Sequence, residues 1–363
     1  MDYNSYRRKT RPIKVGNITV GGDAFVSVQS MTNTDTHDVE ATYRQVMALA
    51  RCGCDIVRIT APDILSLDTF RVLKERGVTV PLVADIHFDY KIAVAVAKHA
   101  DKIRINPGNI GGKDKIREVV RACREYGVPI RIGVNSGSLE KELLKKYGAP
   151  TPEALAESAL YHASLLEDLD FRDIAISVKA SDTHSMIAAN RILAERTSYP
   201  LHLGVTEAGF GASAIVKSSV GIGALLASGI GDTVRVSLTD DPTREVEVAR
   251  EILRSLGIAK NAGMNIVSCP TCGRTKISLI PLAKEFEKRA REEGLDKMNI
   301  TVALMGCVVN GPGEAREADI GIAGGNGEGL IFKRGEIIAK VGEDELLDRL
   351  ISEIKEMKGK DEQ

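Results

Sequence analysis

Between about residues 24 and 256, eight short runs rich in β-branched residues alternate with longer segments of helical periodicity. A strand followed by a helix, repeated, is typical of parallel βαβ units. Eight such units close a barrel of about 250 residues, so the sequence predicts an α/β fold built on a TIM (β/α)8 barrel. The predicted strands are 24–31, 55–60, 80–87, 101–106, 129–135, 173–179, 200–206 and 232–237. The predicted helices are 39–51, 64–76, 90–99, 115–126, 152–169, 185–195, 213–227 and 243–256, with a short extra helix over 139–147.

Two further segments flank this repeat. Residues 13–22 contain turn residues at Gly16-Asn17 and Gly21-Gly22, which predicts a small hairpin that closes the bottom of the barrel. The repeat stops in the Gly/Ala/Asn-containing segment 257–265, where we place a domain boundary. The predicted domains are a substrate-binding barrel, 1–258, and a smaller α+β domain, 259–363. The elements predicted in the second domain are strands 300–305, 319–323 and 337–341 and helices 281–293 and 344–357.

Composition excludes several classes of protein. The 363 residues are 43% hydrophobic and carry a formal net charge of −1, which is atypical of both a disordered chain and a broad nucleic-acid surface. No apolar run reaches the roughly 18 residues of a membrane span, and the basic N-terminus is followed by no apolar stretch of a signal peptide. We therefore expect a cytoplasmic protein whose six cysteines bind metal or are buried, rather than forming disulfides.

Polar residues recur on one face of the predicted strands. In the run 101–106, Ile103 and Ile105 share one face, whereas Arg104 and Asn106 share the other. The aliphatic face must contact the helices, so the polar face is predicted to point into the barrel near the carboxyl ends of the strands, where barrel active sites are built. The predicted inward residues are Arg58, Asp85, His87, Arg104, Asn106, Arg131, Asn135, Ser177, Lys179, His202, Thr206 and Ser237.

Cations predominate among these inward residues. A buried charge without a partner is costly, and Asp85 and Glu207 neutralise only part of the excess. Arginine matches phosphate oxygens bidentately, which predicts a phosphate-rich substrate. One or two of the arginines are alternatively structural, and a structural salt bridge is the expectation for Arg235. The four cations assigned to the phosphate are Arg58, Arg104, Arg131 and Lys179.

Three cysteines fall in the second domain. Cys269 and Cys272 form a C-x2-C pair, and Cys307 precedes an Asn-Gly-Pro-Gly-Glu run that ends at Glu314. Three thiolates suit zinc or an iron–sulfur cluster. A structural zinc usually takes four protein ligands of the Cys and His type, whereas three thiolates and a carboxylate suit a cluster with one labile iron. Cys52, Cys54 and Cys123 belong to barrel elements and are predicted to be buried.

Taken together, these motifs resemble the bacterial 4-hydroxy-3-methylbut-2-enyl diphosphate synthase family of the methylerythritol phosphate pathway, in its short two-domain form. The resemblance covers essentially the whole chain. The motifs that carry it begin at Gln29, Asp55, Asp85, Arg104, Arg131, Ser177, Leu203, Cys269 and Gly306 and include Arg104-Ile-Asn-Pro-Gly-Asn109 and Gly306-Cys-Val-Val-Asn-Gly-Pro-Gly-Glu314.

The resemblance implies an iron–sulfur oxidoreductase of isoprene biosynthesis that opens the ring of 2-C-methyl-D-erythritol 2,4-cyclodiphosphate by reductive dehydration. It implies a [4Fe-4S] cluster on Cys269, Cys272, Cys307 and Glu314, with Glu314 also a catalytic candidate. It further implies electrons from flavodoxin or ferredoxin, and a homodimer in which the cluster domain of one subunit caps the barrel of the other. Glu207 is the candidate acid for the departing hydroxyl, and Asp85, His87 and Asn135 are expected to orient the substrate.

Two other functions remain open from the residues alone. The first is a barrel enzyme for a phosphorylated or pterin substrate, with a C-terminal tail in which the cysteines bind a structural zinc. The colour of the purified protein distinguishes zinc, which is colourless, from a brown iron–sulfur cluster. A simple electron carrier would need no cation-lined barrel. A radical adenosylmethionine enzyme would need a C-x3-C-x2-C run, which the sequence lacks.

Overall fold

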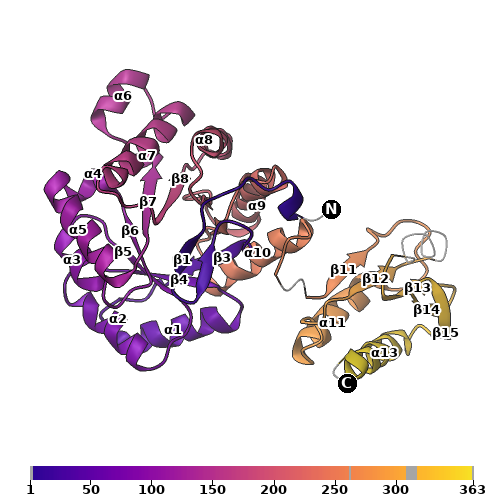
Figure 1. Ribbon diagram of the computed structural model, residues 1–363. Coiled ribbons are helices and arrows are strands. Elements are labelled where there is room, and N and C mark those ends of the chain that lie inside the picture. The colour runs from indigo at the N-terminus through magenta and orange to yellow at the C-terminus, as the bar shows by residue number, and fades with distance from the viewer. Residues whose placement is uncertain (1–2, 261–262, 308–316, 362–363) are drawn as a thin grey trace. The chain divides into compact units, whose positions relative to one another are not determined.

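The computed structural model describes residues 3–260, 263–307 and 317–361. The chain divides into two compact units, Met1–Ala259 and Lys260–Gln363 (Figure 1). Each unit is described by itself. No helix in the described ranges is long and apolar enough to cross a membrane.

The first unit is a parallel eight-stranded barrel. Its strands are ordered β8-β7-β6-β5-β4-β3-β10-β9, and a bridge between Ile176 and Leu201 joins the two ends of this order. The prediction of a TIM barrel is confirmed. The strands are β3 (Ser27–Met31), β4 (Ile56–Thr60), β5 (Leu82–Asp85), β6 (Lys102–Ile105), β7 (Ile130–Asn135), β8 (Ile174–Lys179), β9 (His202–Leu203) and β10 (Thr233–Val234).

Helices surround the strands, and several begin at the caps that the sequence supplies. The Asp38 carboxylate accepts the backbone N–H of Ala41, and Thr151 and Asp241 each precede a proline in the first helical turn. A four-residue helix after β6, α4, was not predicted. The helices of this unit are η1 (Tyr3–Ser5), α1 (Val39–Arg51), α2 (Ser66–Glu75), α3 (Tyr90–Val96), α4 (Pro107–Ile110), α5 (Lys113–Tyr126), η2 (Ser136–Ser138), α6 (Lys141–Tyr147), α7 (Pro152–Glu167), α8 (Thr183–Arg196), α9 (Gly211–Ala227) and α10 (Pro242–Ser255).

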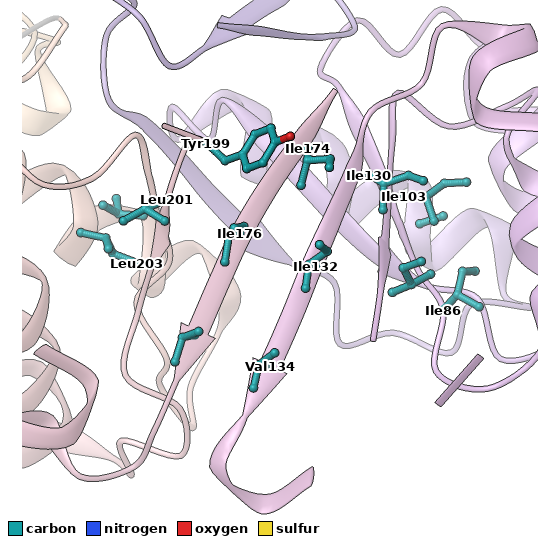
Figure 2. Packing of buried hydrophobic residues seen from close by; sticks show 14 of the residues in the cluster. Ile86, Ile103, Ile130, Ile132, Val134, Ile174, Ile176, Tyr199, Leu201 and Leu203 are labelled. Carbon is teal, nitrogen blue, oxygen red and sulfur yellow. The ribbon is translucent and has the colours of Figure 1, made fainter. Parts of the chain in front are cut away.

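The outward faces of the strands form the main hydrophobic core. Ile103, Ile130 and Ile176 are fully buried and point from neighbouring strands toward the helices (Figure 2). This arrangement confirms the predicted alternation, because the aliphatic residues all belong to the core between strands and helices. The interior of the barrel is left to the opposite faces of the same strands.

A hairpin closes the amino-terminal end of the barrel, as predicted. β1 (Ile13–Val15) and β2 (Ile18–Val20) pair antiparallel. Their buried residues Ile13, Val15 and Val20 form a separate apolar cluster with Ile56, Val83 and Ala175, which begin the inward faces of β4, β5 and β8. Apolar side chains of the hairpin and of three barrel strands therefore pack together at this end of the barrel.

The second unit is a mixed five-stranded sheet with helices on one face. β11 (Asn265–Ser268), β12 (Thr301–Met305) and β13 (Ile320–Gly324) run parallel, whereas β14 (Glu328–Lys333) and β15 (Glu336–Gly342) are antiparallel to their neighbours. Helices α11 (Leu279–Glu292) and α13 (Leu346–Asp361) contribute Phe286, Leu350 and Ile354 to the core of this unit. β11 and β14 were not predicted. All four residues of β11 are exposed, and its sequence, Asn-Ile-Val-Ser, has no alternation of apolar and polar residues.

Candidate active site

The buried carboxylate of Asp85 is the centre of a charged cluster inside the barrel. Its Oδ1 accepts a hydrogen bond from Arg104 Nη1 at 3.1 Å, and its Oδ2 lies 3.7 Å from Arg58 Nε and 3.8 Å from His87 Nε2. Burial raises the pKa of Asp85, but Arg58 and Arg104 outweigh burial and lower that pKa to about 2. Asp85 is therefore an ionised anchor for two of the predicted cations.

Arg131 has no such partner. Its side chain is 1% exposed, and within the described ranges its Nε and Nη1 atoms have no hydrogen-bond acceptor. Burial and the nearby charges of Arg58 and Arg104 lower its pKa well below the usual range. Unsatisfied buried donors are costly, so this arrangement favours an anionic ligand that would accept from Arg131.

Arg58 and Lys179 complete the predicted set of cations. Arg58 Nη2 lies 2.8 Å from the Met31 sulfur, a weak acceptor, and burial lowers the Arg58 pKa to about 10. Burial, followed by repulsion from Arg235, lowers the pKa of Lys179 well below its usual range. A Cβ atom at Gly204 would lie 2.9 Å from Lys179 Nζ, so the glycine leaves room for the lysine.

Arg235 forms the expected salt bridge. Its Nη2 and Nε atoms lie 3.1 and 3.3 Å from the two carboxylate oxygens of Glu245 on α10. The assignment of Glu207 as a neutralising anion was wrong: Glu207 is exposed, and no ion pair links it to a barrel cation in the part of the chain described. Glu207 lies in the loop after β9, with a left-handed φ of 53°. Such backbone strain in a non-glycine residue is typical of functional loops.

The remaining predicted residues occupy three environments. Ser177 and His202 are buried, and the His202 Nδ1 atom lies 2.7 Å from Thr233 Oγ1. Asn106 is also buried, but its side-chain oxygen accepts from the Gly108 N–H and caps α4. The half-buried residues at the strand ends are Asn135, Thr206 and Ser237, and His87 is exposed.

Two interior residues were missed. Lys102 has the same parity as Arg104 and is 1% exposed, and Gln29 on β3 is equally buried, with both amide atoms unpaired among the described residues. The same alternation, continued from Arg104 two residues toward the start of its strand, identifies Lys102, and the alternation applied to the run 24–31 identifies Gln29. The prediction applied the alternation only from Ile103 onward in the run 101–106 and did not apply it to the run 24–31.

Three cysteines line one pocket in the second unit. Cys269 follows β11 and Cys307 follows β12, and because these strands are parallel neighbours their carboxyl ends bring both thiols to one edge. Cys272 lies on the intervening loop, at which Thr271 has a φ of 65°. The pocket is lined by Cys269, Pro270, Thr271, Cys272, Arg274, Thr275, Met305, Gly306 and Cys307.

Backbone donors surround these thiols. The Gly306 N–H donates to Cys269 Sγ at 3.3 Å, and the Arg274 N–H donates to Cys272 Sγ at 3.5 Å. The Arg274 backbone and then its side chain lower the pKa of the Cys272 thiol, which favours the thiolate that binds metal. A Cβ atom at Gly306 would lie 3.4 Å from Cys269 Sγ and 2.8 Å from Thr275, so glycine keeps this approach open.

The other cysteines are inert by comparison. Cys54 and Cys123 are buried, as predicted, and burial raises the pKa of each thiol to about 12. Cys52 was also predicted to be buried but is half-buried, and burial raises its pKa to about 11. Glu314, the predicted fourth ligand, lies outside the described residues. Within those residues, no three His, Cys, Asp or Glu side chains are arranged to hold a single metal ion.

Comparison with known proteins covers both units. Residues 10–250 match the model of the GcpE TIM-barrel domain, and residues 265–356 match that of the GcpE protein C-terminal domain. A Clostridium perfringens protein named 4-hydroxy-3-methylbut-2-en-1-yl diphosphate synthase (flavodoxin) is 59% identical over 95% of this chain and 98% of its own length. A Geobacter sulfurreducens protein of the same name is 57% identical over 97% and 98%.

Solved structures that resemble the chain share the fold alone. A truncated 3-deoxy-D-arabino-heptulosonate 7-phosphate synthase from Thermotoga maritima aligns with a TM-score of 0.50 at 15% identity, over 69% of this chain and 95% of that one. At this identity the similarity supports the barrel architecture and nothing about chemistry.

Proposed function

Because this chain belongs to the GcpE family, we propose that it catalyses the reductive dehydration and ring opening of 2-C-methyl-D-erythritol 2,4-cyclodiphosphate to 4-hydroxy-3-methylbut-2-enyl diphosphate. The resemblance seen in the sequence is confirmed by both family models and by the full-length relatives. The observation that carries the proposal is the unpaired cationic interior of the barrel, above all the buried donors of Arg131.

The barrel binds the diphosphate in this proposal. Arg131 supplies unpaired donors, Lys179 supplies a further buried cation, and Asp85 pairs with Arg58 and Arg104. Charge-assisted, forked hydrogen bonds are the strongest that a protein offers to phosphate. The surrounding polar side chains assigned to the rest of the substrate are His87, Asn106, Asn135, Ser177, His202, Thr206 and Ser237.

Glu207 is the proposed acid for the departing hydroxyl. With a pKa of about 2, Asp85 is ionised and has no proton to give, so it serves to orient the substrate together with His87 and Asn135. Glu207 lies on the loop that follows β9, at the carboxyl ends of the barrel strands where substrates react. Its proton converts the hydroxyl into water as the carbon–oxygen bond breaks.

A [4Fe-4S] cluster is the proposed cofactor of the second unit. Cys269, Cys272 and Cys307 would hold three irons, and Glu314 would hold the fourth. The donor set fits: three thiols share one pocket, backbone N–H groups point at two of them, and the Cys272 pKa is lowered. A cluster separates its ligands further than a single ion does. When bound, the cluster supplies the two electrons of the reaction one at a time.

The partners follow from this chemistry. We propose flavodoxin or ferredoxin as the electron donor, which agrees with the word flavodoxin in the names of the relatives. We also propose a homodimer in which the cluster unit of one subunit covers the barrel of the other. The exposed apolar residues Leu65, Phe88 and Phe210, in the loops after β4, β5 and β9, support a covered barrel mouth. Thiolate ligands and a reducible cluster favour the cytoplasm.

The test is anaerobic reconstitution of the full chain with iron and sulfide, followed by reaction of the cyclodiphosphate with a chemical reductant. The expected sample is brown and forms the linear diphosphate, which mass spectrometry detects. Glu207→Gln should keep the colour and the binding of the cyclodiphosphate but lose roughly 100-fold or more in turnover. A colourless, zinc-containing protein that leaves the cyclodiphosphate intact would overturn the proposal.

A further inference from the structure

Lys102 is the buried charge of the barrel that the proposed mechanism leaves without a role. It begins β6, lies two residues before Arg104 on the same inward face, and is 1% exposed. The structure gives its amine no hydrogen-bond acceptor and no carboxylate partner anywhere in the described ranges. The charged groups that act on it most strongly are Arg131 and Arg58, both cations.

The carboxylates that face the barrel interior already pair with other cations, so neither of them neutralises Lys102. β5 contributes Asp85, which already pairs with Arg58 and Arg104. Glu245 reaches in from α10 and pairs with Arg235. The other ionisable groups that line the interior, from β7, β8 and β9, are Arg131, Lys179 and His202. Burial, followed by repulsion from Arg131, lowers the pKa of Lys102 well below its usual range, so the ligand-free barrel favours the neutral amine.

The proposed reaction makes the ligand more negative, whereas the barrel interior has an excess of positive charge. A cyclic diphosphate carries one negative charge on each phosphate. Opening the ring at a carbon–oxygen bond leaves that oxygen on a terminal phosphate, so the linear product carries one negative charge more. The interior therefore gains anionic charge on binding and again on ring opening, next to an amine able to accept a proton.

We propose that Lys102 is a positioning residue that takes up one proton from solvent when the diphosphate binds above it, and thereby adds the positive charge that ring opening requires. This inference rests on the proposed function, since it uses the same diphosphate. Lys102 acts through the layer of Arg58, Arg104 and Arg131 and transfers no proton to carbon or to the hydroxyl. Its uncharged form keeps the ligand-free barrel from carrying a further buried, unpaired cation.

The experiment is calorimetric titration of the oxidised, cluster-loaded enzyme with the cyclodiphosphate, without reductant, in buffers of different ionisation enthalpy. The cyclodiphosphate has no group that titrates near neutral pH, so proton uptake reports the protein. We expect wild-type enzyme to take up more protons per ligand than Lys102→Met, by up to one, and Lys102→Met to bind about tenfold more weakly. Lys102→Met removes the buried amine and keeps an unbranched apolar chain as far as the ε position, so the variant should fold.

The sign of the pH dependence follows from the linkage. The Lys102 pKa is low in the free enzyme and rises in the complex, so the affinity of wild-type enzyme falls as pH rises between those two values, and that part of the fall is missing in Lys102→Met. Lys102→Arg, which stays protonated, should bind within about threefold of wild type yet show the low proton uptake of Lys102→Met.

The outcomes separate the two proposals. Binding with equal proton uptake in wild type and Lys102→Met would overturn the inference and leave the proposed function standing. Uptake that survives in Lys102→Met but disappears in His202→Asn would assign the proton to His202 instead and also overturn it. Absence of any binding of the cyclodiphosphate would overturn the proposed function.

Discussion

The two ends of the barrel interior are built on the same strands and differ completely in chemistry. At the amino-terminal end Ile56, Val83 and Ala175 pack against the hairpin in an apolar cluster. Two residues further along two of these strands lie Arg58 and Asp85, and Arg131 beside them has unpaired donors. The apolar end stabilises the fold, whereas the unpaired cations at the charged end are expected to gain partners only when a ligand binds.

On one and the same strand, a residue expected to stabilise the fold and a residue expected to bind the substrate therefore lie only two positions apart. A change at the apolar end should reduce stability and leave the chemistry of folded molecules unchanged. Removal of an unpaired cation at the charged end should abolish activity and leave stability unchanged or improved, because an unpaired buried charge destabilises the folded state.

The largest effect is expected for Arg131→Met. The substitution removes the buried donors proposed to bind the diphosphate, and two charge-assisted hydrogen bonds correspond to about a thousandfold in kcat/KM. The thermal midpoint should stay the same or rise, since the variant no longer buries an unpaired guanidinium. A large drop in the midpoint with normal kinetics would place Arg131 with the stabilising end instead.

The next effect, on stability, is expected for Ile56→Ala. Ile56, the first residue of β4, is fully buried against the hairpin. Its truncation leaves a cavity and costs about 3 kcal/mol in the free energy of unfolding. Urea denaturation measures that loss. At a temperature where the variant is folded, its KM for the cyclodiphosphate should match wild type, and a large change in KM would break the separation between the two ends.

The sequence predicted most of this architecture because both signals are local. Alternating strand and helix patterns identified all eight barrel strands, and strand parity alone placed Arg58, Arg104, Arg131 and Lys179 inside. The bounds were less accurate where strands are short: β10 contains only Thr233 and Val234, whereas six residues were predicted.

Tertiary pairing accounts for what the sequence did not predict. Glu245 lies on a helix outside the strand pattern, yet it neutralises Arg235 because α10 packs beside β3. Lys102 was missed because the alternation was applied only from Ile103 onward in its strand, although Lys102 has the same parity as Arg104. β11 has an exposed, unpatterned sequence, and only its parallel pairing with β12 makes it a strand.

The third prediction concerns the stability of the barrel at low pH, where Asp85 at the charged end becomes protonated. The folded pKa of Asp85 is about 2, below the usual carboxylate value, so its ionised form adds stability that is present above about pH 4 and is lost as pH falls toward 2. The contribution is roughly 2 kcal/mol. Unfolding measured between pH 5 and pH 2 should therefore be less pH-dependent in Asp85→Asn than in wild type.

The control for that measurement lies at a surface carboxylate. Asp114 on α5 pairs with Arg117 in an exposed helical pair, which contributes little to stability. Asp114→Asn should keep the wild-type pH profile. If both variants show that profile, Asp85 is not the group whose protonation destabilises the barrel.

The smallest predicted effect concerns the space around Arg104. A Cβ atom at Gly133 would lie 2.4 Å from Arg104 Nε and 2.8 Å from Nη2, so Gly133→Ala must displace the guanidinium from Asp85. We expect about a tenfold rise in KM for the cyclodiphosphate. Gly137→Ala is the matched control, because a Cβ there meets nothing within 4 Å. Because the alanine at 133 clashes with a side chain and not with backbone, the fold should survive. Equal KM values in the two variants would mean that Arg104 binds no phosphate and belongs with the residues that only stabilise the barrel.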